Sequence, residues 1–194
     1  MITDNERKAI IDLLHSQVVP AIGCTEPISV ALCVAKAASI MGRLPERIEL
    51  SLSLNILKNA MGVGIPGTGM VGLPIAIALG AVAGKPELEL EVLRDITPGD
   101  VAAARRYVDE KRIKIALEEE DADKLYIRVV CKCGEDETKA VIKGHHTDFV
   151  LLEKNGEVIF EKSAVEAKKE AEGVPLTLSK VYEFATTTCL DDIR

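Results

Sequence analysis

The chain has 194 residues, 47% of them hydrophobic, which is enough apolar side chain to bury the core of one domain or of two small ones. Its 24 Lys and Arg residues are outnumbered by 31 Asp and Glu residues, and aromatic residues make up 3% of the chain, without Trp. Nucleic-acid-binding proteins cluster basic residues against phosphates and stack bases on aromatic rings. The composition therefore excludes nucleic acid as an expected partner.

Neither a membrane nor export is expected from the pattern of apolar residues. The longest apolar stretch, Met70 to Ala83, is shorter than the ~20 residues that a helix needs to cross a bilayer, and Pro74 and Gly80 interrupt it. The polar start of the chain lacks the basic-then-apolar order of a signal peptide. We therefore expect a cytoplasmic protein whose five cysteines are reduced.

The first half of the chain has helical periodicity with one strand. Apolar residues recur at helical spacing over residues 3–19 and over Glu26 to Met41, and the second run is apolar nearly all round, which predicts a buried helix. Arg47 to Leu54 alternates polar and apolar residues, as a half-buried strand does. Asn55 to Gly69 is expected to be a glycine-rich loop that leads into an apolar helix from Met70 to Ala83.

Short strands dominate the chain after Pro86. Leu88 to Val92 alternates, and Pro98 can open a helix that runs to Lys111. Glycine turns at Cys133-Gly134 and Asn155-Gly156 are typical of hairpins. The expected strands are Ile113 to Ala116, Lys124 to Val130, Thr138 to Lys143, Thr147 to Leu152 and Val158 to Phe160.

An α+β fold follows, with a strand-rich subdomain inserted into a helical module. We expect residues 1–86 to form the first part of a buried helical catalytic module, and residues 87–162 to form a smaller α+β subdomain. Residues 163–194 are expected to be a linker, Ser163 to Glu172, and a helix, Thr177 to Asp192, that returns to the first module. Because the chain ends within a renewed apolar pattern, it is expected to be a fragment.

Cys24 is the first candidate for chemistry. It lies between two predicted helices, in the segment from Ile22 to Pro27. Backbone N–H groups and the helix dipole at a helix N-terminus favour a thiolate, which lowers the pKa of the thiol and suits it to metal binding or nucleophilic attack. The alternative is a buried cysteine with a packing role, which is common for free cysteines.

The glycine-rich segment Asn55 to Gly69 is the second candidate. Glycine lets a backbone approach a ligand closely, and a following helix N-terminus offers N–H donors to a carboxylate or phosphate. The segment is not a Walker loop, because no Gly-Lys-Ser/Thr follows, and it lacks the context of a dinucleotide-binding motif. The sequence leaves two interpretations open: a loop whose backbone binds an anion, and a loop whose glycines serve tight packing.

Two further groups of residues have weaker patterns. Cys131 and Cys133 share one face of a predicted strand and could bind zinc if two more ligands approached, but a core role is the simpler interpretation. His145 and His146 lie at a strand boundary, where a histidine can act as a base or simply be exposed.

Several of these motifs together resemble one enzyme family. The segment Gly23-Cys24-Thr25-Glu26-Pro27, the pair Lys58-Asn59 followed by Val63-x-Ile65-Pro66, and Gly69-x-x-Gly72 before Ala76-x-Ala78-Leu79-Gly80 are similar to the L-cysteine desulfidase family. That family is related to the alpha chain of iron-sulfur L-serine dehydratases. The segment Gly144 to Gly156 is similar too, so the resemblance covers most of the chain.

The resemblance implies a four-iron, four-sulfur cluster held by three cysteines, of which Cys24 would be the first. The family's other two ligands belong to a C-terminal half that this chain lacks, and Cys131, Cys133 and Cys189 do not occupy their places. The fragment alone is therefore expected to be inactive. The expected catalytic residues are Glu26, Lys58 and His146, and the expected substrate-binding residues are Thr25, Asn59, Gly62, Gly64 and Gly67.

The implied reaction is elimination of sulfide from L-cysteine, which gives pyruvate and ammonia without pyridoxal phosphate. L-Serine dehydration is the near alternative, because the two leaving groups differ mainly in polarity and affinity for iron. A non-catalytic module that binds an anionic metabolite is a second alternative, and a zinc-stabilised interaction domain is a third. A small amino acid is the expected partner, and the sequence is compatible with a homo-oligomer.

Overall fold

The computed structural model describes residues 2–118, 123–162 and 175–193. The chain divides into two compact units, and each is considered by itself. The first, here called the sheet unit, is Ala21–Lys162. The second, here called the helical unit, combines Met1–Pro20 with Ser163–Arg194.

A mixed sheet organises the sheet unit. Its strand order among the described residues is β4-β1-β5-β6-β7-β8. Strand β1, next to the edge strand β4, runs parallel to β4 and antiparallel to β5, and the later pairs are antiparallel. The α+β fold class is thereby confirmed. The strands are β1 (Arg47–Leu52), β4 (Ile113–Leu117), β5 (Tyr126–Cys133), β6 (Asp136–Lys143), β7 (Phe149–Lys154) and β8 (Glu157–Glu161).

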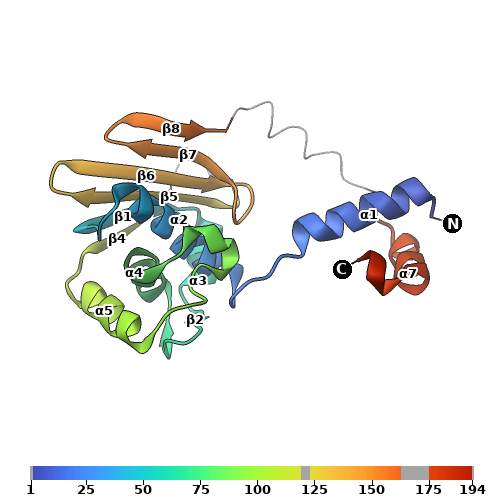
Figure 1. The fold of residues 1–194 in the computed structure, drawn as a ribbon, viewed down its shortest axis with the longest axis horizontal. Helices are drawn as coiled ribbons and strands as arrows, with labels where there is room; N and C mark the ends of the chain where they lie inside the picture. The colour runs from blue at the N-terminus through green and yellow to red at the C-terminus, as the bar shows by residue number, and fades with distance from the viewer. Residues whose placement is uncertain (1, 119–122, 163–174, 194) are drawn as a thin grey trace. The chain divides into compact units, whose positions relative to one another are not determined.

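The helices of the sheet unit pack on one face of this sheet (Figure 1). Helix α2 (Thr25–Met41) packs against β5, β6 and α4 (Leu73–Ala83), and α4 in turn contacts α5 (Pro98–Asp109). Helix α2 is buried on nearly all sides, as its composition predicts, and it ends at Gly42 in the left-handed conformation. The sequence prediction of a buried helix is therefore confirmed.

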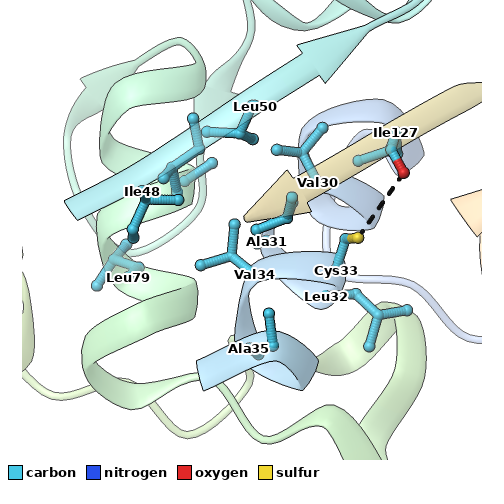
Figure 2. Packing of buried hydrophobic residues seen from close by; sticks show 14 of the residues in the cluster. Val30, Ala31, Leu32, Cys33, Val34, Ala35, Ile48, Leu50, Leu79 and Ile127 are labelled. Carbon is cyan, nitrogen blue, oxygen red and sulfur yellow. Dashed lines mark hydrogen bonds between the residues drawn. The ribbon is translucent and has the colours of Figure 1, made fainter. Parts of the chain in front are cut away.

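Aliphatic side chains of α2 fill the space between α4 and the sheet. Figure 2 shows Ala31 and Val34 of α2 close to Ile48 of β1 and Leu79 of α4. In the same core the Cys33 thiol donates weak hydrogen bonds to the carbonyl oxygens of Ile127, at 3.9 Å, and Ala140, at 3.4 Å. Cys33 is thus a core residue, as expected.

Helices α2 and α4 approach so closely that one position accepts only glycine without movement. A Cβ atom added to Gly80 would lie 2.5 Å from the carbonyl oxygen of Ala31, well inside van der Waals contact. The missing side chain at Gly80 lets the two helix backbones come into direct contact at this crossing.

The chain does not divide at the expected boundary near residue 86. Strand β1, placed by sequence in the first module, pairs with β4 and β5, which were placed in the second. Helix α1 (Asp4–Gln17), also expected in the first module, groups instead with residues 163–194. Sheet pairing joins segments that are distant in sequence, so a change in composition at Pro86 did not mark a change of domain.

The expected loop Asn55 to Gly69 contains regular structure. Helix α3 (Leu54–Ala60) begins after Ser53, whose hydroxyl oxygen accepts a hydrogen bond from the Ile56 amide. A small hairpin of β2 (Gly64–Ile65) and β3 (Met70–Val71) follows, and α4 starts only after it. The alternating residues Leu88 to Val92 likewise form no strand, because Pro86–Glu91 is the 3-10 helix η1.

The helical unit pairs α1 with α7 (Leu178–Thr187), followed by the 3-10 turn η2 (Leu190–Asp192). Thr3 and Glu6 form a capping box at the start of α1. Lys180 of α7 forms an ion pair with Glu6 at 2.6 Å. The helix expected within Thr177 to Asp192 is therefore present as α7, and it packs with α1. Its return to a catalytic module stays a prediction. The expected helix or linker Ser163 to Glu172 lies outside the described residues.

No helix within the described ranges is both long enough and apolar enough to cross a membrane.

Candidate functional site

Cys24 is the N-cap residue of α2, and the turn that carries it is held against the β2–β3 hairpin. Its backbone is extended, with φ −70° and ψ 132°, and the helix begins at Thr25. Gly23 has φ +80°, and a Cβ atom there would lie 3.0 Å from Cγ of Pro66. Both the left-handed backbone and this close approach favour glycine. The Cys24 turn therefore lies directly beside the glycine-rich hairpin.

Glu26 joins the N-terminus of α2 to α3. Its Oε2 accepts a hydrogen bond from the Cys24 thiol at 2.9 Å and from the Thr25 hydroxyl at 3.4 Å. Its Oε1 accepts one from the side-chain amide of Asn59, on α3, at 3.4 Å. Because both carboxylate oxygens are engaged, the side chain of Glu26 is fixed in position. The structure thus brings together Cys24, Thr25, Glu26 and Asn59, here called the Cys24 cluster.

His146 reaches this cluster from the connection between β6 and β7. The hydroxyl of Ser29, a fully buried residue one turn into α2, donates a hydrogen bond of 2.5 Å to the His146 carbonyl oxygen. This bond fixes the His146 loop close to Glu26, and the two side chains interact electrostatically. Sequence reasoning missed Ser29, whose only signal was a hydroxyl in the apolar run from Pro27 to Ala35.

The pKa of Cys24 moves in the opposite direction from the one expected. Burial raises the pKa of its thiol above the ordinary value, and the hydrogen bond to Glu26 raises it further, although backbone N–H groups of Thr25 and Glu26 oppose this. Correspondingly, the pKa of Glu26 is lowered, first by the hydrogen bond from Cys24. The expectation of a thiolate favoured by the helix N-terminus was wrong, because burial of the thiol and, after it, the carboxylate within hydrogen-bond distance both raise its pKa.

The imidazole ring of His146 is largely neutral at pH 7. Burial lowers its pKa below the ordinary value of 6.5, and the negative charge of Glu26 opposes that shift without reversing it. A lowered pKa means that the ring is largely unprotonated at neutral pH, so it can accept a proton. A partly buried, neutral histidine beside a fixed carboxylate is a suitable general base.

The remaining predicted site residues are Lys58 and three glycines of the segment after α3. Lys58 is exposed on α3, next to Asn59, and in the described part of the chain no hydrogen bond or ion pair joins it to the cluster. Gly62 and Gly64 face open space, where an added Cβ would meet nothing within 4 Å. Gly67 adopts φ +77° and packs near Ile96. All three glycines are exposed, and their roles in substrate binding stay predictions.

The other cysteines lie elsewhere. Burial raises the pKa of Cys131 to about 12, so the thiolate that zinc requires is disfavoured at that position. Cys133 is also buried in the sheet unit, and Cys189 is exposed in the helical unit. Across the residues that the structure describes, no group of three His, Cys, Asp or Glu side chains could hold a metal ion. Cys24 is therefore at most one member of a ligand set.

These features define an α+β protein with a polar thiol–carboxylate–imidazole site at the N-terminus of a buried helix. The chain is 55% identical over 193 residues to the UPF0597 protein BF3560 of Bacteroides fragilis, a match that covers 99% of this chain and 45% of the relative. A UPF0597 protein of Phocaeicola vulgatus is 54% identical over 195 residues, covering 100% and 45%. One of Porphyromonas gingivalis is 44% identical over 195 residues, covering 97% and 45%.

The chain thus spans about half the length of the curated relatives it matches, since the matched part is 45% of the Bacteroides fragilis protein. No family model matches the chain. No solved structure matches it either.

Replacing Glu26 with glutamine is expected to make Cys24 more reactive. Removal of the negative charge lowers the pKa of the thiol, so more of it is thiolate at pH 8, and alkylation by iodoacetamide should be several-fold faster. Mass spectrometry of the Cys24 peptide over a series of reaction times measures this rate in the 194-residue chain. Glu49→Gln, which removes a carboxylate paired with Lys132, is the control and should leave the rate unchanged. Equal rates for both variants would contradict the role assigned to Glu26.

Proposed function

We propose that this chain forms one half of an iron-sulfur lyase that eliminates sulfide from L-cysteine. The proposal rests chiefly on the Cys24 cluster, in which a thiol, a carboxylate and an amide from two separate segments meet beside His146 from a third. These segments are the ones that carry the resemblance to the L-cysteine desulfidase family. Their meeting at one helix N-terminus supports a shared chemical role.

The described residues can supply only part of the ligand set that an iron-sulfur cluster needs. Cys24 can supply one thiolate, but the described residues hold no complete set of metal ligands, so the other ligands must come from outside them. This chain alone is therefore not expected to bind an iron-sulfur cluster. When bound, a cluster with three thiolate ligands keeps one iron open as a Lewis acid for the substrate's carboxylate and leaving group. The raised pKa of Cys24 implies that a proton leaves when its sulfur becomes a ligand.

The chain's own residues suit the handling of a small amino acid. His146, neutral at pH 7, accepts the proton on the α-carbon of the substrate. Glu26, which is ionised at pH 7 and whose lowered pKa favours the charged form further, binds the substrate's amino group together with Asn59. Lys58 and the backbone N–H groups of Gly62, Gly64 and Gly67 bind its carboxylate. Each of these roles belongs to the proposal.

The overall reaction is balanced without an external oxidant. As the α-proton leaves, the bond between the β-carbon and sulfur breaks, and sulfide departs with the electron pair of that bond. The aminoacrylate that remains is hydrolysed, so L-cysteine and water give pyruvate, ammonia and hydrogen sulfide. L-Serine would react in the same way with water as the leaving group. Reduced thiols suit a cytoplasmic location, which is part of the proposal.

Anaerobic reconstitution tests the proposal on the longer Bacteroides fragilis relative. Loading with iron and sulfide should give a brown protein that releases pyruvate and sulfide in equal amounts from L-cysteine. L-Serine, assayed in parallel, identifies the preferred leaving group. A protein that takes up no iron and releases no pyruvate from either amino acid would overturn the proposal. Binding of an anionic metabolite without turnover would then favour the non-catalytic module.

A further inference from the structure

The helical unit has too small a core to account for its own stability. Helix α1 has 14 residues and α7 has 10, and among the described residues of the unit only Ile10 and Phe184 are buried hydrophobic side chains. Isolated helices of about 12–15 residues or fewer are marginal in water. Two buried side chains do not offset the entropy of ordering two such helices. The unit therefore needs further apolar cover.

The side of α7 that contacts α1 is already engaged. Lys180 pairs with Glu6 at 2.6 Å, and the hydroxyl of Thr187 accepts a hydrogen bond from the Arg7 guanidinium at 3.0 Å. The amide of Ile2 donates to the carboxylate of Glu183 at 2.8 Å. These contacts orient α7, so its opposite side faces away from α1.

That opposite side carries a continuous apolar row. Leu178 is 88% exposed, Val181 47% and Tyr182 73%. Their spacing of three and four residues places them on one face of the helix. We call these three residues the α7 stripe. Single exposed apolar residues are common, but a row of large ones along one helix face marks a contact surface.

We propose that the α7 stripe is the docking surface for the part of the longer relatives that lies outside their match to these 194 residues. The Bacteroides fragilis relative matches 99% of this chain with 45% of its own length, which leaves more than half of it unmatched. That unmatched part is large enough to cover the stripe. Its contact with the stripe would be intramolecular in a full-length protein, so a small area suffices.

A second copy of this chain is a poorer occupant. A stable interface buries about 800 Å² on each partner. Three side chains on a helix of 10 residues fall short of that area if the stripe pairs only with itself. The unmatched polypeptide can in contrast surround α7 and add cover beyond the stripe.

Hydrogen exchange provides the first test. The amides of α7 in the 194-residue chain should exchange at least about tenfold faster than those of the aligned helix in the intact Bacteroides fragilis relative, because the added cover suppresses local opening. This comparison uses no substitution. Equal exchange rates in the two proteins would overturn the proposal.

Paired substitutions provide the second test, in a chimera in which this chain replaces the matched part of the relative. Tyr182→Lys should restore fast exchange in α7, whereas Ser179→Lys, at an exposed position outside the stripe, should leave exchange slow. In the 194-residue chain both variants should exchange like the parent. If the two variants behave alike in the chimera, the stripe is not the docking surface. If the 194-residue chain forms a dimer that Tyr182→Lys dissociates, the occupant is a second copy and the proposal is wrong.

Discussion

Cys24→Ala is expected to abolish the visible absorption of the iron-sulfur cluster and to reduce pyruvate formation by more than about a hundredfold. The variant is made in the chimera in which this chain replaces the matched part of the Bacteroides fragilis relative, after reconstitution with iron and sulfide. A cluster with three protein thiolates loses one of its attachments, and substitutions even of residues that merely support metal ligands cost about 10–100-fold. Absorption spectra, iron content and pyruvate release from L-cysteine measure the effect. Each is recorded under anaerobic conditions, so that oxidation does not imitate loss of the ligand.

Cys189→Ala is the matched control for this experiment. Cys189 is also free, but it is exposed and belongs to the helical unit rather than to the Cys24 cluster. The control should keep its absorption and its activity. If Cys24→Ala keeps both as well, then Cys24 is not a ligand, and the lyase proposal loses the residue on which it depends.

Gly80→Ala is expected to destabilise the 194-residue chain by about 1–2 kcal/mol. Helix propensity alone favours alanine over glycine by about 1 kcal/mol. The added Cβ would, however, lie 2.5 Å from the carbonyl oxygen of Ala31, and α2 and α4 must move apart to relieve that contact. Forced overpacking of a well-packed interior costs about 1–3 kcal/mol and occasionally more, so the contact outweighs the propensity.

Urea unfolding measures this difference from the midpoint and slope of the transition. Gly62→Ala is the control, since a Cβ at Gly62 would meet nothing within 4 Å, and its free energy of unfolding should change by less than about 0.5 kcal/mol. A Gly80→Ala protein more stable than the parent would show that the helices separate freely, and the close α2–α4 crossing would then have no structural role.

Local patterns predicted most of the elements. The alternation over Arg47 to Leu54 and the turn at Asn155-Gly156 correspond to β1 and to the β7–β8 hairpin. The apolar run from Glu26 to Met41 corresponds to α2. The prediction from local pattern was wrong at α3. Because glycines follow Ala60, residues Asn55 to Ala60 were assigned to the expected loop, although Ser53 caps a helix there.

The site was only partly predictable. The sequence singled out Cys24, Glu26, Asn59 and His146 separately, through their neighbours and a family resemblance. It contained no sign that Asn59 would donate to Glu26, or that Ser29 would hold the His146 loop. The direction of the Cys24 pKa shift was predicted wrongly for the same reason, since burial of the thiol and then its hydrogen bond to Glu26 raise the pKa, and both depend on the tertiary structure.

The sequence by itself determined where most helices and strands form, which of them are buried, and which segments carry chemical groups. These depend on residues a few positions apart, whose spacing is written in the chain. Only the tertiary structure decided that β1 lies between β4 and β5, and that Ser29 reaches a carbonyl 117 residues away. Such contacts arise from how buried faces pack, and many pairings of the same elements satisfy the local pattern equally well.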